Sequence, residues 1–160
     1  MIVENTKIEQ LKQIFKENHG QYLTDKNAIS SDMLKVVYEQ DKEALGYAVI
    51  YEGIDFCEKE QYNLKIEDIQ MPCVYIWQLA TKKGFERQGI ASHILQYVVE
   101  KFKNYEIYAC VNIQNVASMK VHCKNGFIPI KYFEEQKQDG GIDKNLMLRR
   151  ERKKQDENTF

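Results

Sequence analysis

The sequence lacks an excess of charge of either sign. Among its 160 residues, 23 lysines and arginines are balanced by 24 aspartates and glutamates, for a net charge of -1. Without a basic excess, no global electrostatic attraction draws the chain to nucleic acid or to an anionic membrane. We therefore expect neither as a partner.

Long apolar segments are also missing. No stretch approaches the roughly 20 apolar residues that a membrane helix needs. The opening residues, MIVENTKIEQ, show neither the basic segment nor the apolar run of a secretory signal. We expect a cytoplasmic protein.

The four cysteines form no C-x-x-C pair. Cys57, Cys73, Cys110 and Cys123 lie far apart in the sequence. This spacing argues against a zinc site and a redox motif, and it favours free, buried thiols in a reducing compartment. We expect no metal.

The chain does contain the composition of one globular domain. Hydrophobic residues make up 43% and charged residues 29% of the sequence, and the length allows one core. Apolar periodicity and capping signals predict strand, helix, three strands, helix, strand, helix and two strands. This order predicts a single α/β (α+β) domain over residues 1–150 with a mixed sheet and helices on its faces, followed by a polar tail at 151–160. The predicted strands are 2–5, 32–40, 43–52, 73–81, 106–111, 127–136 and 144–150, and the predicted helices are 6–20, about 90–104 and a short one after Asn115.

The segment FERQGIAS (85–92) joins a predicted central strand to a predicted helix. Gly89 and Ala91 are small, and the first amides of a helix have no partners within it. An anion can bind there through the backbone, because small residues leave room for its approach. The alternative is a tight turn in which small residues only let the helix pack on the strand. This segment taken alone supports both interpretations.

A second segment, NIQNVASMKVHCKNGF (112–127), favours the first interpretation. Together, LATKKGFERQGIASHIL and N-x-A-S-x-x-x-H-x-x-x-GF resemble the GNAT superfamily of N-acetyltransferases over residues 43–148. The resemblance implies that this chain transfers an acetyl group from acetyl-CoA to a primary amine in a ternary complex. It also implies two central parallel strands that splay apart to admit the pantetheine arm.

The resemblance implies a set of coenzyme-binding residues. Leu79 to Thr81 would meet the pantetheine arm, the backbone from Arg87 to Ser92 would hold the pyrophosphate, and Asn115 would contact the coenzyme. Lys124 stands where it could meet a phosphate, although a solvated lysine fits equally well. The implied residues are Leu79, Ala80, Thr81, Arg87, Gln88, Gly89, Ile90, Ala91, Ser92, Asn115 and Lys124.

Two positions depart from the family pattern. Glu86 occupies a position that usually holds Gln or Arg, and we expect its carboxylate to point away from a pyrophosphate. His122 replaces a tyrosine that is proposed to protonate the departing thiolate. Histidine can also donate a proton, so His122 is the candidate catalytic residue, with a packing role as the alternative. Cys123 cannot form a dyad with His122, since adjacent helical residues point about 100° apart, and we expect it in the core.

The acceptor side is less defined. The central strand offers Trp77 and Gln78 where relatives often have a glutamate, so a general base would be Glu52, Glu67, Asp68 or ordered water. Acidic residues between positions 52 and 68 could attract a cationic amine, although a solvated surface loop is the alternative. A non-catalytic acyl-CoA-binding or protein-interaction module is the second hypothesis for the whole chain, as a monomer or a homodimer. The basic cluster at 149–154 is interpreted as a solvated end.

Overall fold

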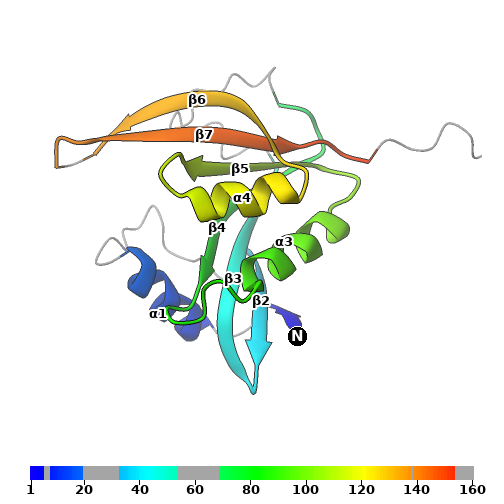
Figure 1. Ribbon diagram of the computed structural model, residues 1–160. Coiled ribbons are helices and arrows are strands. Elements are labelled where there is room, and N and C mark those ends of the chain that lie inside the picture. The colour runs from blue at the N-terminus through cyan, green and yellow to red at the C-terminus, as the bar shows by residue number, and fades with distance from the viewer. Residues whose placement is uncertain (6–7, 20–32, 54–68, 138, 154–160) are drawn as a thin grey trace, which may run out of the picture. The chain divides into compact units, whose positions relative to one another are not determined.

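A computed structural model of the protein describes residues 1–5, 8–19, 33–53, 69–137 and 139–153 (Figure 1). Every strand and helix predicted within these ranges is present, with some ends shifted by a few residues. The elements are β1 (Ile2–Glu4), α1 (Ile8–His19), β2 (Leu34–Gln40), β3 (Glu43–Glu52), β4 (Cys73–Thr81), α3 (Ile90–Lys101), β5 (Glu106–Asn112), α4 (Val116–Lys124), β6 (Ile128–Gln136) and β7 (Ile142–Arg150).

The strands form one mixed sheet in the order β1-β2-β3-β4-β5-β7-β6. Pairing is antiparallel between β1 and β2, β2 and β3, β5 and β7, and β6 and β7. The single parallel pair is β4 and β5, which α3 connects. A mostly antiparallel α/β sheet confirms the predicted fold class, whereas the splay of its central strands stays a prediction.

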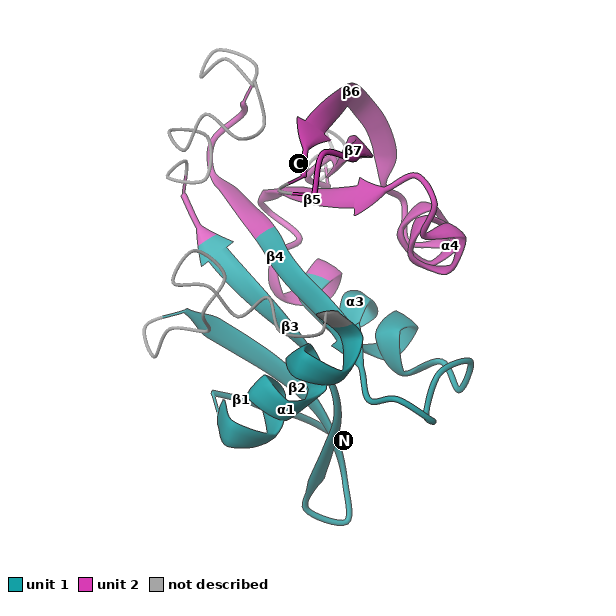
Figure 2. Cartoon of the chain, turned by 90° about the vertical axis from the view of Figure 1, so that its left-hand side faces the viewer, with its two compact units in different colours: residues 1–51, 76–98 teal, residues 52–75, 99–160 magenta. Residues whose placement is uncertain are grey.

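The described chain forms two compact units (Figure 2). Unit 1 contains residues 1–51 and 76–98, and unit 2 contains residues 52–75 and 99–160. The strand β4 contributes its first three residues to unit 2 and the rest to unit 1. No helix within the described residues is long and apolar enough to cross a membrane.

Unit 1 is built on the β2–β3 hairpin, which turns at Asp41 and Lys42. Both turn residues have positive φ, 51° and 65°, which is the backbone of a two-residue turn that suits antiparallel strands. One face of the hairpin packs against α1. The buried residues of this core are Leu11, Ile14, Phe15, Val37, Ala44, Tyr47, Val49 and Ala80.

The opposite face of β3 meets α3 at Gly46. A Cβ atom on Gly46 would lie 2.7 Å from Cγ2 of Ile90 and 3.1 Å from the carbonyl oxygen of Ala80. Ile90 and Ile94 belong to the buried face of α3. Because residue 46 has no side chain, the first turn of α3 lies directly on the strand.

Unit 2 contains β5, β7, β6 and α4. The β6–β7 hairpin turns at the DGG segment (139–141), where Lys137 donates its amide to the carbonyl of Gly141 at 2.7 Å. The largest buried apolar residues of this unit come from β5, β7 and the turn between α4 and β6. They are Ile107, Tyr108, Met147, Leu148 and Phe127.

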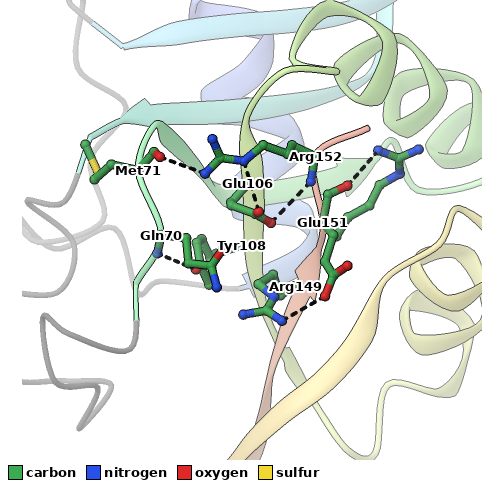
Figure 3. Close-up of polar contacts among 8 residues, drawn as sticks. Gln70, Met71, Glu106, Tyr108, Arg149, Glu151 and Arg152 are labelled. Carbon is green, nitrogen blue, oxygen red and sulfur yellow. Dashed lines mark hydrogen bonds and ion pairs between the residues drawn. The ribbon is translucent and has the colours of Figure 1, made fainter. Parts of the chain in front are cut away.

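Contacts of unit 2 continue past residue 150 (Figure 3). The guanidinium of Arg152 donates through Nε to Oε1 of Glu106 at 3.2 Å and through its terminal nitrogen to the carbonyl of Met71 at 2.7 Å. Glu106 is 3% exposed. Arg152 is therefore part of the packed structure rather than a solvated residue of the predicted tail, and residues 154–160 lie outside the described residues.

Candidate functional site

The connection from β4 to α3 leaves a row of backbone amides without partners. Within the described part of the chain, the amides of residues 87–92 donate no hydrogen bond, and His93 is the first to do so, to the carbonyl of Gly89 at 2.9 Å. Gly89 has φ +80° and Arg87 has φ +66°. A non-glycine residue in this region is uncommon and is enriched at functional sites.

The side chains of the loop leave this row open to an anion. The carboxylate of Glu86 accepts the amide of Gly84 at 2.8 Å, so it is engaged with its own loop. Lys82 forms an ion pair with Glu43. Arg87 is exposed and makes no ion pair with any described residue. The free amides, the positive end of the α3 dipole and Arg87 together suit a phosphate group.

The last residues of β4 lie next to this loop in unit 1. Leu79 and Thr81 are half-buried, and Ala80 is buried in the core that α1 covers. The carbonyl oxygen of Thr81 already accepts Nδ2 of Asn18 at 2.9 Å. This bond uses one of the two lone pairs of that oxygen.

The helix α4 carries the second motif, in unit 2. The side chain of Asn115 accepts the amide of Ser118 at 3.1 Å and so caps the helix as predicted. Ser118 in turn accepts, through its carbonyl oxygen, Nδ1 of His122 at 2.7 Å. Asn115 and His122 are therefore connected through one residue of the first turn.

His122 is the buried residue of α4, at 2% exposure. Its ring meets that of Phe127 edge-on at 5.1 Å. Burial lowers the pKa of His122, and the hydrogen bond to Ser118 opposes this shift only in part. The second ring nitrogen, Nε2, is buried and has no hydrogen-bond partner in the described chain. A buried polar atom without a partner is costly, and it commonly marks a site for a ligand or a water.

The sequence also made predictions for Lys124 and Cys123 on α4, and the structure agrees with only one of them. Lys124 is exposed at the end of the helix, as either of its interpretations requires. Cys123 is also exposed, so the prediction that it lies in the core is wrong. The reason is rotation: α4 presents His122 to the core, and the next residue points about 100° away. Cys73, in contrast, is buried, and burial raises the pKa of its thiol to about 11. Cys57 lies outside the described residues.

The central strand β4 contains no aspartate or glutamate, so none of its side chains offers a carboxylate as a general base. Gln78 is buried and its Oε1 accepts the hydroxyl of Tyr47 at 2.9 Å. Trp77 meets the ring of Tyr51 edge-on at 6.4 Å, so this aromatic pair belongs to unit 1. Glu52 is exposed and accepts the hydroxyl of Tyr105 at 3.4 Å. Glu67 and Asp68 lie outside the described residues.

The predicted site residues thus fall into two groups. Leu79 to Thr81 and Arg87 to Ser92 belong to unit 1, whereas Asn115, His122 and Lys124 belong to unit 2. Sequence reasoning missed the Asn115–Ser118–His122 connection, although Asn at i and His at i+7 on one helix face was a visible signal. It also missed the pair of Arg152 and Glu106, which no local pattern indicates.

Comparison with known proteins identifies the fold independently. The structure resembles the ribosomal-protein-S18-alanine N-acetyltransferase from Escherichia coli, with a TM-score of 0.72 at 12% identity, covering 100% of this chain and 99% of that one. It also resembles a putative acetyltransferase from Salmonella typhimurium solved with its cofactor acetyl-CoA, with a TM-score of 0.68 at 13% identity, covering 98% and 96%. At such identities the likeness shows the fold alone. No curated protein matches the chain by sequence.

A family match extends over most of the sequence. The profile described as the acetyltransferase (GNAT) family matches residues 5–127, a range that includes the free-amide loop, the end of β4 and the whole of α4. The chain belongs to the acetyltransferase (GNAT) family.

Proposed function

We propose that this protein transfers an acetyl group from acetyl-CoA to a primary amine of a small molecule or peptide, in the cytoplasm. The observation that carries the proposal is the row of free amides from residue 87 to residue 92 at the start of a family-typical helix. Acetyl-CoA supplies the activated acyl group and presents a pyrophosphate that such a row can bind.

The protein's own contribution is mainly to position the two substrates. The amides of Arg87 to Ser92 and the side chain of Arg87 would bind phosphate oxygens, and backbone groups of Leu79 to Thr81 would align the pantetheine arm. Asn115 would contact the coenzyme through its amide nitrogen, since its oxygen caps α4. Holding an amine next to a thioester can supply a large part of the rate acceleration.

The direct test uses purified protein and acetyl-CoA. At a concentration about 100 times the dissociation constant, the coenzyme should stabilise the fold by about 2.7 kcal/mol, which raises the melting temperature by roughly 5–10 °C for a protein of this size. Thiol release should then be measured with spermidine, kanamycin and peptides that carry an N-terminal alanine or a lysine. Absence of any thermal shift would contradict the proposal.

Replacing Gly89 with alanine should weaken acetyl-CoA binding about tenfold, a loss of about 1.4 kcal/mol. Gly89 has φ +80°, and an alanine there is strained by about 1–2 kcal/mol. Relaxation of that strain turns the neighbouring amides away from their present direction. Calorimetric titration with acetyl-CoA measures the change.

Gly140→Ala is the matched control for this variant. Gly140 has φ +88°, a Cβ there would meet no atom within 4 Å, and the residue lies in the β6–β7 turn. It should lose similar stability and keep wild-type affinity for acetyl-CoA. Equal affinities of the two variants would show that the loop around Gly89 does not bind the coenzyme.

The second candidate function is a non-catalytic acyl-CoA-binding module. The buried Gln78 favours it, because this neutral side chain, which accepts the hydroxyl of Tyr47 on β3, stands on the strand where relatives often place a glutamate. Coenzyme binding without thiol release for any amine of the panel would support the module, whereas turnover with one of them would exclude it.

A further inference from the structure

One face of the sheet in unit 2 carries polar side chains that the proposed transfer does not use. The strands β5, β7 and β6 lie side by side in that order (Figure 1). Asn145 on β7 lies opposite Asn112 on β5, and Asp143 on β7 lies opposite Glu135 on β6. Directly opposite residues of antiparallel strands point to the same face, and so do residues two apart on one strand. These four side chains therefore share one face, and we call them the Asn145 cluster.

Contacts of Asp143 agree with this placement. Nδ2 of Asn112 donates to Oδ1 of Asp143 at 3.1 Å. The same oxygen lies 3.2 Å from Nζ of Lys137, in the turn that follows β6. An ammonium group of the chain itself is thus already bound at one end of the cluster.

Glu135 has no such partner. Its half-buried carboxylate makes no hydrogen bond or ion pair in the part of the chain that the structure describes. Burial raises the pKa of Glu135, and the negative charge of Asp143 adds to this shift. Burial also raises the pKa of the Cys110 thiol on β5 to about 12, and the two carboxylates contribute to that shift. Glu135 is therefore a partly desolvated carboxylate without a paired cation.

Asn145 is the second group of the cluster without a partner. It is 8% exposed, and its side-chain amide makes no hydrogen bond with any residue of the described ranges. The residue opposite Asn145 on β6 is Phe133, so Glu135 is its diagonal neighbour across the two strands. A buried amide without partners destabilises a fold, and native proteins retain such groups mainly where a ligand or a water satisfies them.

An ammonium group matches both unpaired groups. It carries three N–H donors and no acceptor, so it can donate to the carboxylate of Glu135 and to the amide oxygen of Asn145 together. An anionic ligand would be repelled by the carboxylates of Glu135 and Asp143. Among the residues that the structure describes, no three histidine, cysteine, aspartate or glutamate side chains are placed to hold a metal ion.

We infer that the Asn145 cluster is a binding site for the primary ammonium group of an organic amine. The site lies entirely on β5, β7 and β6 of unit 2. The inference goes beyond the proposed function, because binding at this site needs neither acetyl-CoA nor turnover.

The test titrates the purified protein, without acetyl-CoA, with 1,5-diaminopentane, and uses 1,5-pentanediol as an uncharged ligand of the same length. NMR follows the side-chain amide signal of Asn145, which is assigned by its absence from Asn145→Leu. The diamine should shift this signal to saturation, and the diol should leave it unchanged. No shift with the diamine, or an equal shift with the diol, would overturn the site. Magnesium chloride that shifts the signal at the same concentrations would overturn the choice of an ammonium ligand.

Glu135→Gln should weaken diaminopentane binding about tenfold in a calorimetric titration, because a neutral amide of the same shape replaces the carboxylate. Glu134→Gln is the matched control. Glu134 is exposed, its carboxylate accepts the hydroxyl of Tyr132 at 2.8 Å, and its place next to Glu135 on the strand points it to the other face. This variant should keep wild-type affinity. Equal losses in the two variants would show that net charge, and not the cluster, attracts the amine.

Asn145→Leu separates a ligand-binding group from a packing residue. Leucine has a similar size and no polar atom, so removal of the unpaired amide should raise the melting temperature. Affinity for diaminopentane should nevertheless fall about fivefold, and unchanged affinity would overturn the cluster. Because these titrations contain no acetyl-CoA, their failure would leave the proposed transfer standing, and failure of the coenzyme to bind would leave this site standing.

Discussion

Replacing Gly46 with valine should lower the free energy of unfolding by about 3 kcal/mol, the upper end of the usual cost of overpacking. A Cβ atom at this position would lie 2.7 Å from Ile90 and 3.1 Å from the backbone oxygen of Ala80. Both contacts are with buried groups, so the strand and α3 would have to separate. The expected fall in melting temperature is roughly 6–12 °C, measurable by calorimetry.

A double-mutant cycle identifies the cause of this loss. Gly46→Ala should also destabilise, by about 1.5 kcal/mol, and part of this cost should disappear when Ile90→Ala removes the Cγ2 methyl group. The combined loss should therefore be smaller than the sum of the two single losses. Strict additivity would show that the contact between residue 46 and α3 is not what limits the substitution.

The position of Gly46 also connects stability to function. Ile90 begins α3, and the free amides of residues 87–92 directly precede or open that helix. If valine pushes the first turn outward, acetyl-CoA affinity should fall together with stability. This sets Gly46→Val apart from the Gly140→Ala control, in which only stability changes.

Replacing Arg152 with alanine should lower the free energy of unfolding by about 2 kcal/mol. The substitution leaves the carboxylate of Glu106 buried, at 3% exposure, without its guanidinium partner. Breaking a fully buried pair costs about 3–5 kcal/mol, and we lower this figure because Arg152 is 35% exposed and partly screened by solvent. Urea denaturation followed by circular dichroism measures the change.

Lys137→Ala provides the matched control. Lys137 and Asp143 are also 3.2 Å apart, but their side chains are 47% and 34% exposed, so removal of this pair should cost less than about 0.5 kcal/mol. The double variant Arg152→Ala/Glu106→Gln should be more stable than Arg152→Ala alone, since it removes the unpaired charge. Similar losses for Arg152→Ala and Lys137→Ala would show that burial of Glu106 does not determine the effect.

The prediction of the fold succeeded where neighbouring residues specify local structure. The spacing of Ile90, Ile94 and Val98 is that of one helix face, and these residues are buried on α3. Asn115 caps α4 through a hydrogen bond with Ser118, which is only three residues further along the chain. Such features depend on backbone geometry within a few turns, which the order of residues specifies directly.

The prediction failed where partners are distant in sequence. Arg152 was assigned to a solvated end, because its pairing with Glu106, 46 residues away, depends on β5 and β7 lying side by side. Cys123 was assigned to the core because the sequence shows an apolar residue on a helix but not which side of that helix is covered.

By itself, the sequence determined the order of the elements, the family and the loop whose small residues open a helix, because periodicity, caps and turns act over short distances along the chain. Only the tertiary structure decided that Nδ1 of His122 donates to Ser118 while Nε2 is buried without a hydrogen-bond partner among the residues that the structure describes. The protonation of a side chain depends on the groups and the solvent that packing brings to it, and residues far apart in sequence supply that packing.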